Sequence, residues 1–244
     1  MPSVHVGDIN VYYELHGAEL RGDGPSLVFI GGLGADLTLF APMTRQLAQH
    51  FRVLTFDNRG AGRTDQPDAP YSIPMMAGDT LRLMDALGID RAHILGVSMG
   101  GRIAIEIAGR HPERVDRLVL ISSAATGTGS LLRLSLPARL MWAAKRLRLL
   151  PRAAHPQTDH AYRHQVAAST SYDGAELLPK ITAPTLLLHG RDDRSMPLAA
   201  AQATKTGIRG ARLEVFEGGH MFALLSQRDV VVERVEAFLS AHEN

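Results

Sequence analysis

The segment around Ser98 constrains the fold of this chain more than any other part of the sequence. An apolar run with β-strand character, residues 92–95, leads into Gly96-Val97-Ser98-Met99-Gly100-Gly101, and a run with helical periodicity follows at 102–108. A Gly-x-Ser-x-Gly turn between a strand and a helix is a nucleophile elbow. The glycines are needed because a β-carbon at either position would collide with the neighbouring segment. The pattern predicts a serine hydroxyl held out at the end of a strand, beside a free Met99 amide at a helix N-terminus, where N–H groups favour negative charge.

A serine hydroxyl is a weak nucleophile, so the chain must also supply a base and an acid that orients it. After an elbow of this kind the order along the chain is serine, then Asp or Glu, then His. The predicted strand 184–189 runs into Asp192 and Asp193, and the predicted strand 211–216 is followed by His220. We expect Asp193 to be the acid, with Asp192 as the alternative, and His220 to be the base. The strand after the elbow helix offers no acid, because no Asp or Glu lies between residues 116 and 159.

Strand-like and helix-like patterns alternate along the chain, as they do in a mostly parallel sheet covered by helices on both faces. An opening antiparallel hairpin is expected from the segments 3–7 and 10–16. Further strands are expected at 26–31, 52–57, 91–96, 117–122, 184–189 and 211–216. Helices are expected at 38–49, 72–87, 99–110, 197–206 and 225–241. In the second helix, a core-facing surface is predicted from the spacing of Met75, Met76, Leu81, Met84 and Leu87.

Four motifs in register make the chain resemble members of the α/β-hydrolase fold superfamily over nearly its whole length. Besides the elbow, they are Gly31-Gly32-Leu33-Gly34, the Asp-x-Arg-Gly-x-Gly-x-Thr loop at 57–64, and the late Gly-x-x-Asp and Gly-Gly-His pair. The resemblance implies a mostly parallel eight-stranded sheet flanked by helices, with a core domain of residues 1–123 and 179–244. It also implies a small helical cap, residues 124–178, inserted after the sixth strand. The loops look somewhat like those of 3-oxoadipate enol-lactonases.

The resemblance further implies that the backbone N–H groups of Leu33 and Met99 bind the oxyanion of the reaction. Two such donors matter, because removing one typically lowers a rate by roughly 10²–10³-fold. Where the family often has His-Gly this chain has Gly31-Gly32, which leaves the amide in place but removes a side chain that can tether the loop. A phosphate-binding glycine loop is disfavoured, since the spacing Gly-x-Gly-x-x-Gly and a following Gly-Lys-Ser/Thr are both missing.

The expected cap segment is both apolar and basic. Between 131 and 152, leucines, Met141 and Trp142 are interspersed with arginines and a lysine, and prolines should divide the segment into short helices. Three interpretations stay open: an apolar pocket with a basic mouth that favours anionic substrates, docking on a membrane surface, and apolar residues facing the core while the cations are solvated. We expect Gly32, Trp142 and Met221 to line the substrate pocket.

Other titratable residues favour a structural interpretation over a functional one. His189 ends the wrong strand for a role at the oxyanion and is expected to be structural. His160 and His164 have the i,i+4 spacing of metal ligands, but a solvated helix is favoured, and neither a metal nor a cofactor is expected. Asp57 and Arg59 could contact substrate, although in a loop of this kind they more often brace the turn.

Composition sets limits and names no function. A net charge of +1 gives no reason to expect a nucleic-acid partner, and the absence of cysteine excludes disulfides and thiolate metal sites. The N-terminus lacks the apolar region of a secretory signal, and no run reaches the roughly 18–20 apolar residues that a membrane span needs. A cytoplasmic protein without stable membrane insertion is therefore expected, and the oligomeric state stays open.

The predicted reaction is two-step acyl transfer on a small to medium carboxylic ester. Ser98 attacks the carbonyl while His220 removes its proton, and Asp193 orients the imidazole. A serine at this position disfavours haloalkane dehalogenases and epoxide hydrolases, which need a carboxylate there. Enol-lactone hydrolysis is the main alternative, and carbon–carbon bond hydrolysis and perhydrolysis also remain. A small-molecule receptor with little turnover is the alternative outside enzymes, because the same pocket would serve it.

Overall fold

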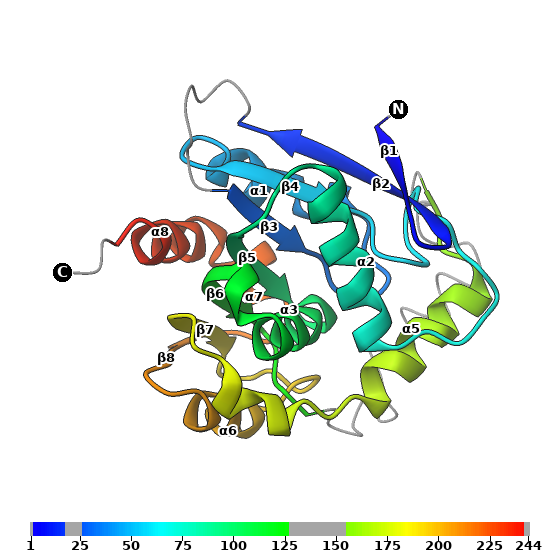
Figure 1. The fold of residues 1–244 in the computed structure, drawn as a ribbon. Helices are drawn as coiled ribbons and strands as arrows, with labels where there is room; N and C mark the ends of the chain where they lie inside the picture. The colour runs from blue at the N-terminus through cyan, green and yellow to red at the C-terminus, as the bar shows by residue number, and fades with distance from the viewer. Residues whose placement is uncertain (1, 18–25, 127–154, 242–244) are drawn as a thin grey trace.

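A single eight-stranded sheet organises the molecule, with strand order β1-β2-β4-β3-β5-β6-β7-β8. The computed structural model describes residues 2–17, 26–126 and 155–241 of the chain (Figure 1). Neighbouring strands are parallel from β4 to β8, whereas β2 pairs antiparallel with both β1 and β4. The predicted mostly parallel eight-stranded sheet, flanked by helices, is therefore confirmed.

All eight expected strands are present, and their ends lie within two residues of the prediction. Their bounds are β1 (Ser3–Val6), β2 (Ile9–His16), β3 (Ser26–Ile30), β4 (Arg52–Phe56), β5 (Ala92–Val97), β6 (Val115–Ile121), β7 (Thr185–Gly190) and β8 (Arg212–Phe216). The agreement is close because most of these segments are continuous apolar runs bounded by polar or glycine residues, the pattern of strands buried on both faces.

The helices are α1 (Ala41–Leu47), α2 (Ile73–Ala86), α3 (Met99–Arg110), α5 (Asp159–Ser171), α6 (Leu198–Gly207), α7 (Phe222–Leu225) and α8 (Arg228–Leu239). Short 3-10 turns are η1 (Leu37–Phe40), η2 (Pro112–Arg114) and η4 (Ala175–Lys180). The single helix predicted at 38–49 is wrong, because Asp36 caps η1 and Pro42 then starts α1 as a new helix. The helix predicted at 225–241 is likewise two helices, α7 and α8.

The buried face of α2 differs from the predicted one. Met76 and Met84 are buried as expected, but Met75 is 38% exposed. Ile73, Met76, Thr80 and Leu83 follow the 3.6-residue period of the face that meets the sheet, and Met75 lies about 100° away from Met76 around that helix. Leu81 and Leu87 are only partly buried against the core.

Alternate side chains of the strands enter two separate cores. In β3, Val28 and Ile30 join the core that includes residues of α2, α3 and α6. Leu27 and Phe29 join the core that includes residues of α1 and α8. Figure 1 shows the corresponding layers, with α2 and α3 on one side of the strands and α1 and α8 on the other. This double coverage leaves the carboxyl ends of the parallel strands as the open edge for a site.

The connection from β6 to β7 contains the segment predicted to be a cap. The described part of this connection comprises residues 122–126 and 155–184, and its main elements are α5 and η4. Trp142 and the apolar and basic residues at 131–152 lie outside the described residues, as do the three interpretations drawn from them. Within the part of the chain that the structure covers, no helix is long and apolar enough to cross a membrane.

Candidate active site

Ser98 lies in the tight turn between β5 and α3. Its backbone has φ 55° and ψ −116°, a conformation that L-residues rarely adopt and that concentrates at functional sites. The flanking glycines are required as predicted: a β-carbon on Gly96 would meet the carbonyl oxygen of Gly100, and one on Gly100 would meet that of Ile30. The Ser98 amide donates to the Ile121 carbonyl at 2.9 Å, and the turn therefore holds the hydroxyl at the carboxyl edge of the sheet.

Three side chains that are far apart in sequence form one hydrogen-bonded relay. His220 Nε2 lies 2.9 Å from Ser98 Oγ, and His220 Nδ1 lies 2.7 Å from Asp193 Oδ2. The Ser122 hydroxyl donates to the backbone carbonyl of His220 at 2.9 Å and fixes the loop that carries the ring. The Asp193 side chain is fully buried and that of His220 is 23% exposed, so the relay leads from the protein interior to the cavity.

The loop after β7 folds around Asp193 and turns Asp192 away. Asp193 Oδ1 accepts hydrogen bonds from the Ser195 and Met196 amides at 2.9 and 2.8 Å, which leaves Oδ2 for His220. Asp192 is exposed. Of the two carboxylates that the sequence offered, the structure therefore brings only Asp193 to the imidazole.

His189, near the end of β7, supports the loop that carries Asp193. Its ring is buried, and Nε2 lies 2.8 Å from the Met196 carbonyl and 3.7 Å from Asp193 Oδ2. Burial lowers the pKa of this imidazole, which favours a neutral ring that donates from Nε2. The contact with Met196 agrees with the structural role expected for His189.

The loop after β3 comes close to Ser98 at Gly32. A β-carbon at Gly32 would be in tight contact with Val97 and Ser98, so there is no room for a larger side chain. Three hydrogen bonds hold this loop. Asn58 Nδ2 donates to the Gly31 carbonyl at 2.9 Å, and the Leu37 amide donates to Asp57 Oδ1 at 2.7 Å. The Gly34 amide donates to Gln165 Oε1 at 2.9 Å. These contacts provide a tether at the position where this chain lacks the histidine common in the family.

Gln165 was missed by the sequence analysis. It lies on α5, is fully buried, and also donates from Nε2 to the Arg59 carbonyl at 2.8 Å. The amide of Gln165 thus joins α5 to the loops after β3 and β4. No local pattern could have indicated this, because Gln165 and Gly34 are 131 residues apart.

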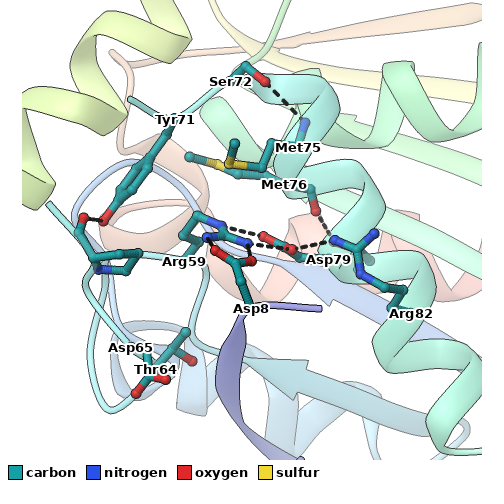
Figure 2. Close-up of polar contacts among 12 residues, drawn as sticks. Asp8, Arg59, Thr64, Asp65, Tyr71, Ser72, Met75, Met76, Asp79 and Arg82 are labelled. Carbon is teal, nitrogen blue, oxygen red and sulfur yellow. Dashed lines mark hydrogen bonds and ion pairs between the residues drawn. The ribbon is translucent and has the colours of Figure 1, made fainter. Parts of the chain in front are cut away.

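The loop after β4 is braced by an ion network around the buried Arg59. Figure 2 shows Arg59 held between Asp8 and Asp79. Its Nε donates to Asp79 Oδ2 at 2.7 Å, and its Nη1 and Nη2 donate to the two oxygens of Asp8 at 2.9 and 2.6 Å. The guanidinium of Arg59 lowers the pKa of Asp8 to about 2. Arg59 and Asp57 therefore support the loop, as the sequence analysis favoured.

A cavity of about 260 Å³ opens beside Ser98 and His220. Its other lining residues include Gly32, Leu33, Met221 and several further apolar side chains. Two of the three residues expected in the pocket, Gly32 and Met221, line this cavity, and the third lies outside the described residues. The cavity has the size and mainly apolar character of a site for a small organic molecule.

Comparisons with known proteins place the chain in a family. The family model described as the alpha/beta hydrolase fold matches residues 25–172. The chain belongs to the α/β-hydrolase fold family. It is 30% identical to the RutD protein of Azorhizobium caulinodans, provisionally named a carbamate hydrolase, over 98% of each chain. The enol-lactonase of Burkholderia xenovorans LB400 superposes with a TM-score of 0.85 and 30% identity, covering 98% of this chain and 100% of the other.

A further relative of this hydrolase-fold chain is the poly(3-hydroxyalkanoate) depolymerase of Ectopseudomonas oleovorans, 30% identical over 88% of this chain and 84% of the relative. These relatives are named as a hydrolase, an enol-lactonase and a depolymerase, and they support a hydrolase. The fold match supports a small-molecule substrate, and the enol-lactonase agrees with the likeness found in the sequence. The relatives differ in the bond named, so the substrate must be argued from the site itself.

The histidine pair on α5 is engaged in hydrogen bonds at the surface of this hydrolase. His160 Nε2 lies 2.9 Å from the Gln66 carbonyl, and His164 Nε2 lies 2.9 Å from Asp68 Oδ1. Among the residues with described positions, no group of three or more His, Asp or Glu is arranged to hold a metal ion. The pair therefore attaches α5 to the loop after β4.

Proposed function

We propose that the protein is a serine hydrolase that cleaves a small to medium carboxylic ester through an acyl-enzyme intermediate on Ser98. The observation that carries the proposal is the continuous relay from Asp193 through His220 to Ser98, with its last hydroxyl at the wall of a cavity. A buried carboxylate, an imidazole and a strained serine in this order supply a base, its orienting group and a nucleophile.

In the first step Ser98 Oγ forms a bond to the substrate carbonyl carbon while His220 Nε2 takes the hydroxyl proton. The carbonyl π electrons move to its oxygen, and the N–H groups of Leu33 and Met99 stabilise that charge. The intermediate then expels the alcohol, which takes the proton from His220. Water attacks the acyl-enzyme by the same route, and the acid and the free serine are released. Asp193 holds the imidazole tautomer that can accept at Nε2 and stabilises the imidazolium.

The segment 124–178 fits a small cap over this site, and residues 1–123 and 179–244 then form the core domain. Gln165 supports this division, because it connects the described part of the segment to the loop that carries Leu33. Removing water from the carbonyl strengthens the hydrogen bonds to the oxyanion, and a cap would serve that purpose.

Lactone hydrolysis is the second candidate. It follows the same steps, except that the leaving alcohol stays attached to the acid. It is favoured by the 30% identity and close superposition with the enol-lactonase of Burkholderia xenovorans LB400.

The test is a panel of p-nitrophenyl esters and five- and six-membered lactones, with wild-type protein and Ser98→Ala. We expect turnover of order 10 s⁻¹ for a good ester, a burst of p-nitrophenol equal to the enzyme concentration where deacylation is slow, and loss of turnover in Ser98→Ala with unchanged circular dichroism. Tight binding of ligand with a single slow turnover would instead identify a receptor. Undiminished activity of Ser98→Ala would reject the proposal.

A further inference from the structure

Arg102 is a buried cation in the wall of the active-site cavity, one helical turn after Ser98 on α3. It is 1% exposed. Nη1 donates to the Ser169 carbonyl and hydroxyl at 2.6 and 2.5 Å, and Nε donates to the Ala124 carbonyl at 3.4 Å. Nη2 donates to the Thr126 carbonyl at 3.2 Å and lies 3.7 Å from Met196 Sδ. Every one of these acceptors is neutral.

Within the described ranges, no carboxylate forms an ion pair with Arg102. Glu106 is one turn further along α3, but its carboxylate binds Arg110 and the Tyr172 hydroxyl. Residues 127–154 contain no Asp or Glu, so none of them can neutralise this charge.

The remaining acids outside the described ranges are Glu19, Asp23 and Glu243. Apart from these three, the described residues and residues 127–154 supply no carboxylate that pairs with Arg102.

An unpaired buried cation is costly unless an opposite charge reaches it. Burial lowers the pKa of Arg102 to about 10, which still leaves it protonated at neutral pH. Arg102 lines the cavity together with Ser169 and Met196, two of its own partners. The guanidinium therefore lies where a bound molecule could supply the missing negative charge.

We propose that the substrate carries a carboxylate on its acyl part, and that Arg102 is the residue that selects it. This inference rests on the proposed acyl transfer at Ser98. Ser98 is the N-cap of α3 and Arg102 lies on its first turn. Both line the same cavity, so one small molecule can carry an ester carbonyl at Ser98 and a carboxylate at Arg102. We expect Nη2 to turn toward the anion, because one of its two partners is the weakly accepting sulfur of Met196, which lines the cavity.

The direct test is binding to the Ser98→Ala variant, which separates recognition from turnover. Methyl hydrogen adipate is compared by calorimetry with methyl 6-methylheptanoate, in which an isopropyl group replaces the carboxylate at similar size and shape. We expect the anionic ester to bind at least tenfold more tightly, with a preference that shrinks as salt is added. Equal or tighter binding of the neutral ester would overturn the proposal and leave Arg102 as a clamp between α3 and α5.

Variants of two arginines on the same helix assign the effect. Arg102→Met, made in the Ser98→Ala background, should bring the ratio of the two affinities close to one, whereas Arg102→Lys should keep part of it. Arg110→Met removes an exposed cation two turns further along α3 and should leave the ratio unchanged. A ratio that survives in a folded Arg102→Met protein would also overturn the proposal. If Arg102→Met does not fold, two other measurements decide the proposal: the affinity ratio of the Ser98→Ala protein with and without added salt, and the affinity ratio of Arg102→Lys in the same background.

Turnover of mono-p-nitrophenyl adipate and p-nitrophenyl 6-methylheptanoate by the wild-type protein distinguishes the two proposals. If neither ester is hydrolysed but the anionic one binds more tightly, the ester-hydrolase proposal fails and the role of Arg102 stands. If both are hydrolysed and the neutral one is preferred, acyl transfer stands and the role of Arg102 is rejected.

Discussion

Arg59 and Arg102 are both buried, but the two regions around them treat the positive charge in opposite ways. In the loop after β4, Arg59 has a carboxylate on each side, Asp8 and Asp79 (Figure 2). In the cavity wall, the described acceptors of Arg102 are all neutral. The first region uses its charges to hold the fold together. In the second, no described carboxylate matches the charge near Ser98, which is the condition expected where a ligand completes the electrostatics.

The same contrast extends to the acids. The Asp79 carboxylate accepts hydrogen bonds from Arg59 and Arg82, and both contacts are structural. Asp193 is equally buried but meets an imidazole whose other nitrogen reaches Ser98. Variants in the braced loop should therefore change stability, and variants in the relay should change activity.

The largest effect should come from Asp193→Asn. Losing the carboxylate that selects the His220 tautomer typically lowers kcat by about 10⁴-fold, and steady-state hydrolysis of a p-nitrophenyl ester measures it. Asp192→Asn is the matched control, because that side chain is exposed and should have little effect. The opposite ranking would move the acid by one residue and remove the contrast with Asp79.

Next in size is the loss of stability in Asp79→Asn. Breaking a buried ion pair by removing one partner costs about 3–5 kcal/mol, and the value should fall near the lower end because Asp8 stays with Arg59. Urea denaturation at pH 7 measures the free energy of unfolding. Asp8→Asn removes an exposed partner and should cost less than about 1 kcal/mol. Equal losses from the two variants would contradict the larger contribution expected of the buried Asp79 than of the exposed Asp8.

A smaller effect is expected from Gln165→Leu, because the side chain of Gln165 links the two regions. The substitution leaves the Gly34 amide and the Arg59 carbonyl without their partner, a loss worth about 1–3 kcal/mol. Because Gly34 follows the proposed oxyanion donor Leu33, we expect kcat to fall roughly tenfold while KM changes less. Gln157→Leu serves as the control, since that side chain contacts Gly60 and Gln165 but donates nothing to the loop after β3. A change in stability alone would limit Gln165 to the braced region.

The smallest effect concerns pH. Burial lowers the pKa of His93 below its ordinary value of 6.5, so below that pH the unfolded chain binds more protons than the folded one. The free energy of unfolding should therefore fall with decreasing pH, by up to roughly 1.4 kcal/mol per pH unit for one such histidine, and the contribution should be constant above 6.5. His93→Leu should flatten the curve from pH 7.5 to 5.5. An unchanged slope would show that His93 is protonated in the folded state.

Much of the fold follows from local patterns. The strands are continuous apolar runs, and a run of that kind has few ways to be buried other than in a covered parallel sheet. Predictions failed where a local signal competed with periodicity. Pro42 and the Asp36 cap divided the helix expected at 38–49, and Met75 was assigned to the core although its neighbour Met76 occupies that face.

Local sequence was enough to predict the elbow at Ser98, the Ser-Asp-His order along the chain, and the sheet that carries these residues. Those features depend on residues that are neighbours in the chain or on the regular order of strands. Three features emerge only in the folded chain: Asp193 rather than Asp192 meets His220, Gln165 holds the loop after β3, and no described carboxylate pairs with Arg102. Each of these depends on how segments far apart in sequence are placed in space, and hydrogen bonds and ion pairs depend on the distance and orientation of the two groups, whatever their separation along the chain.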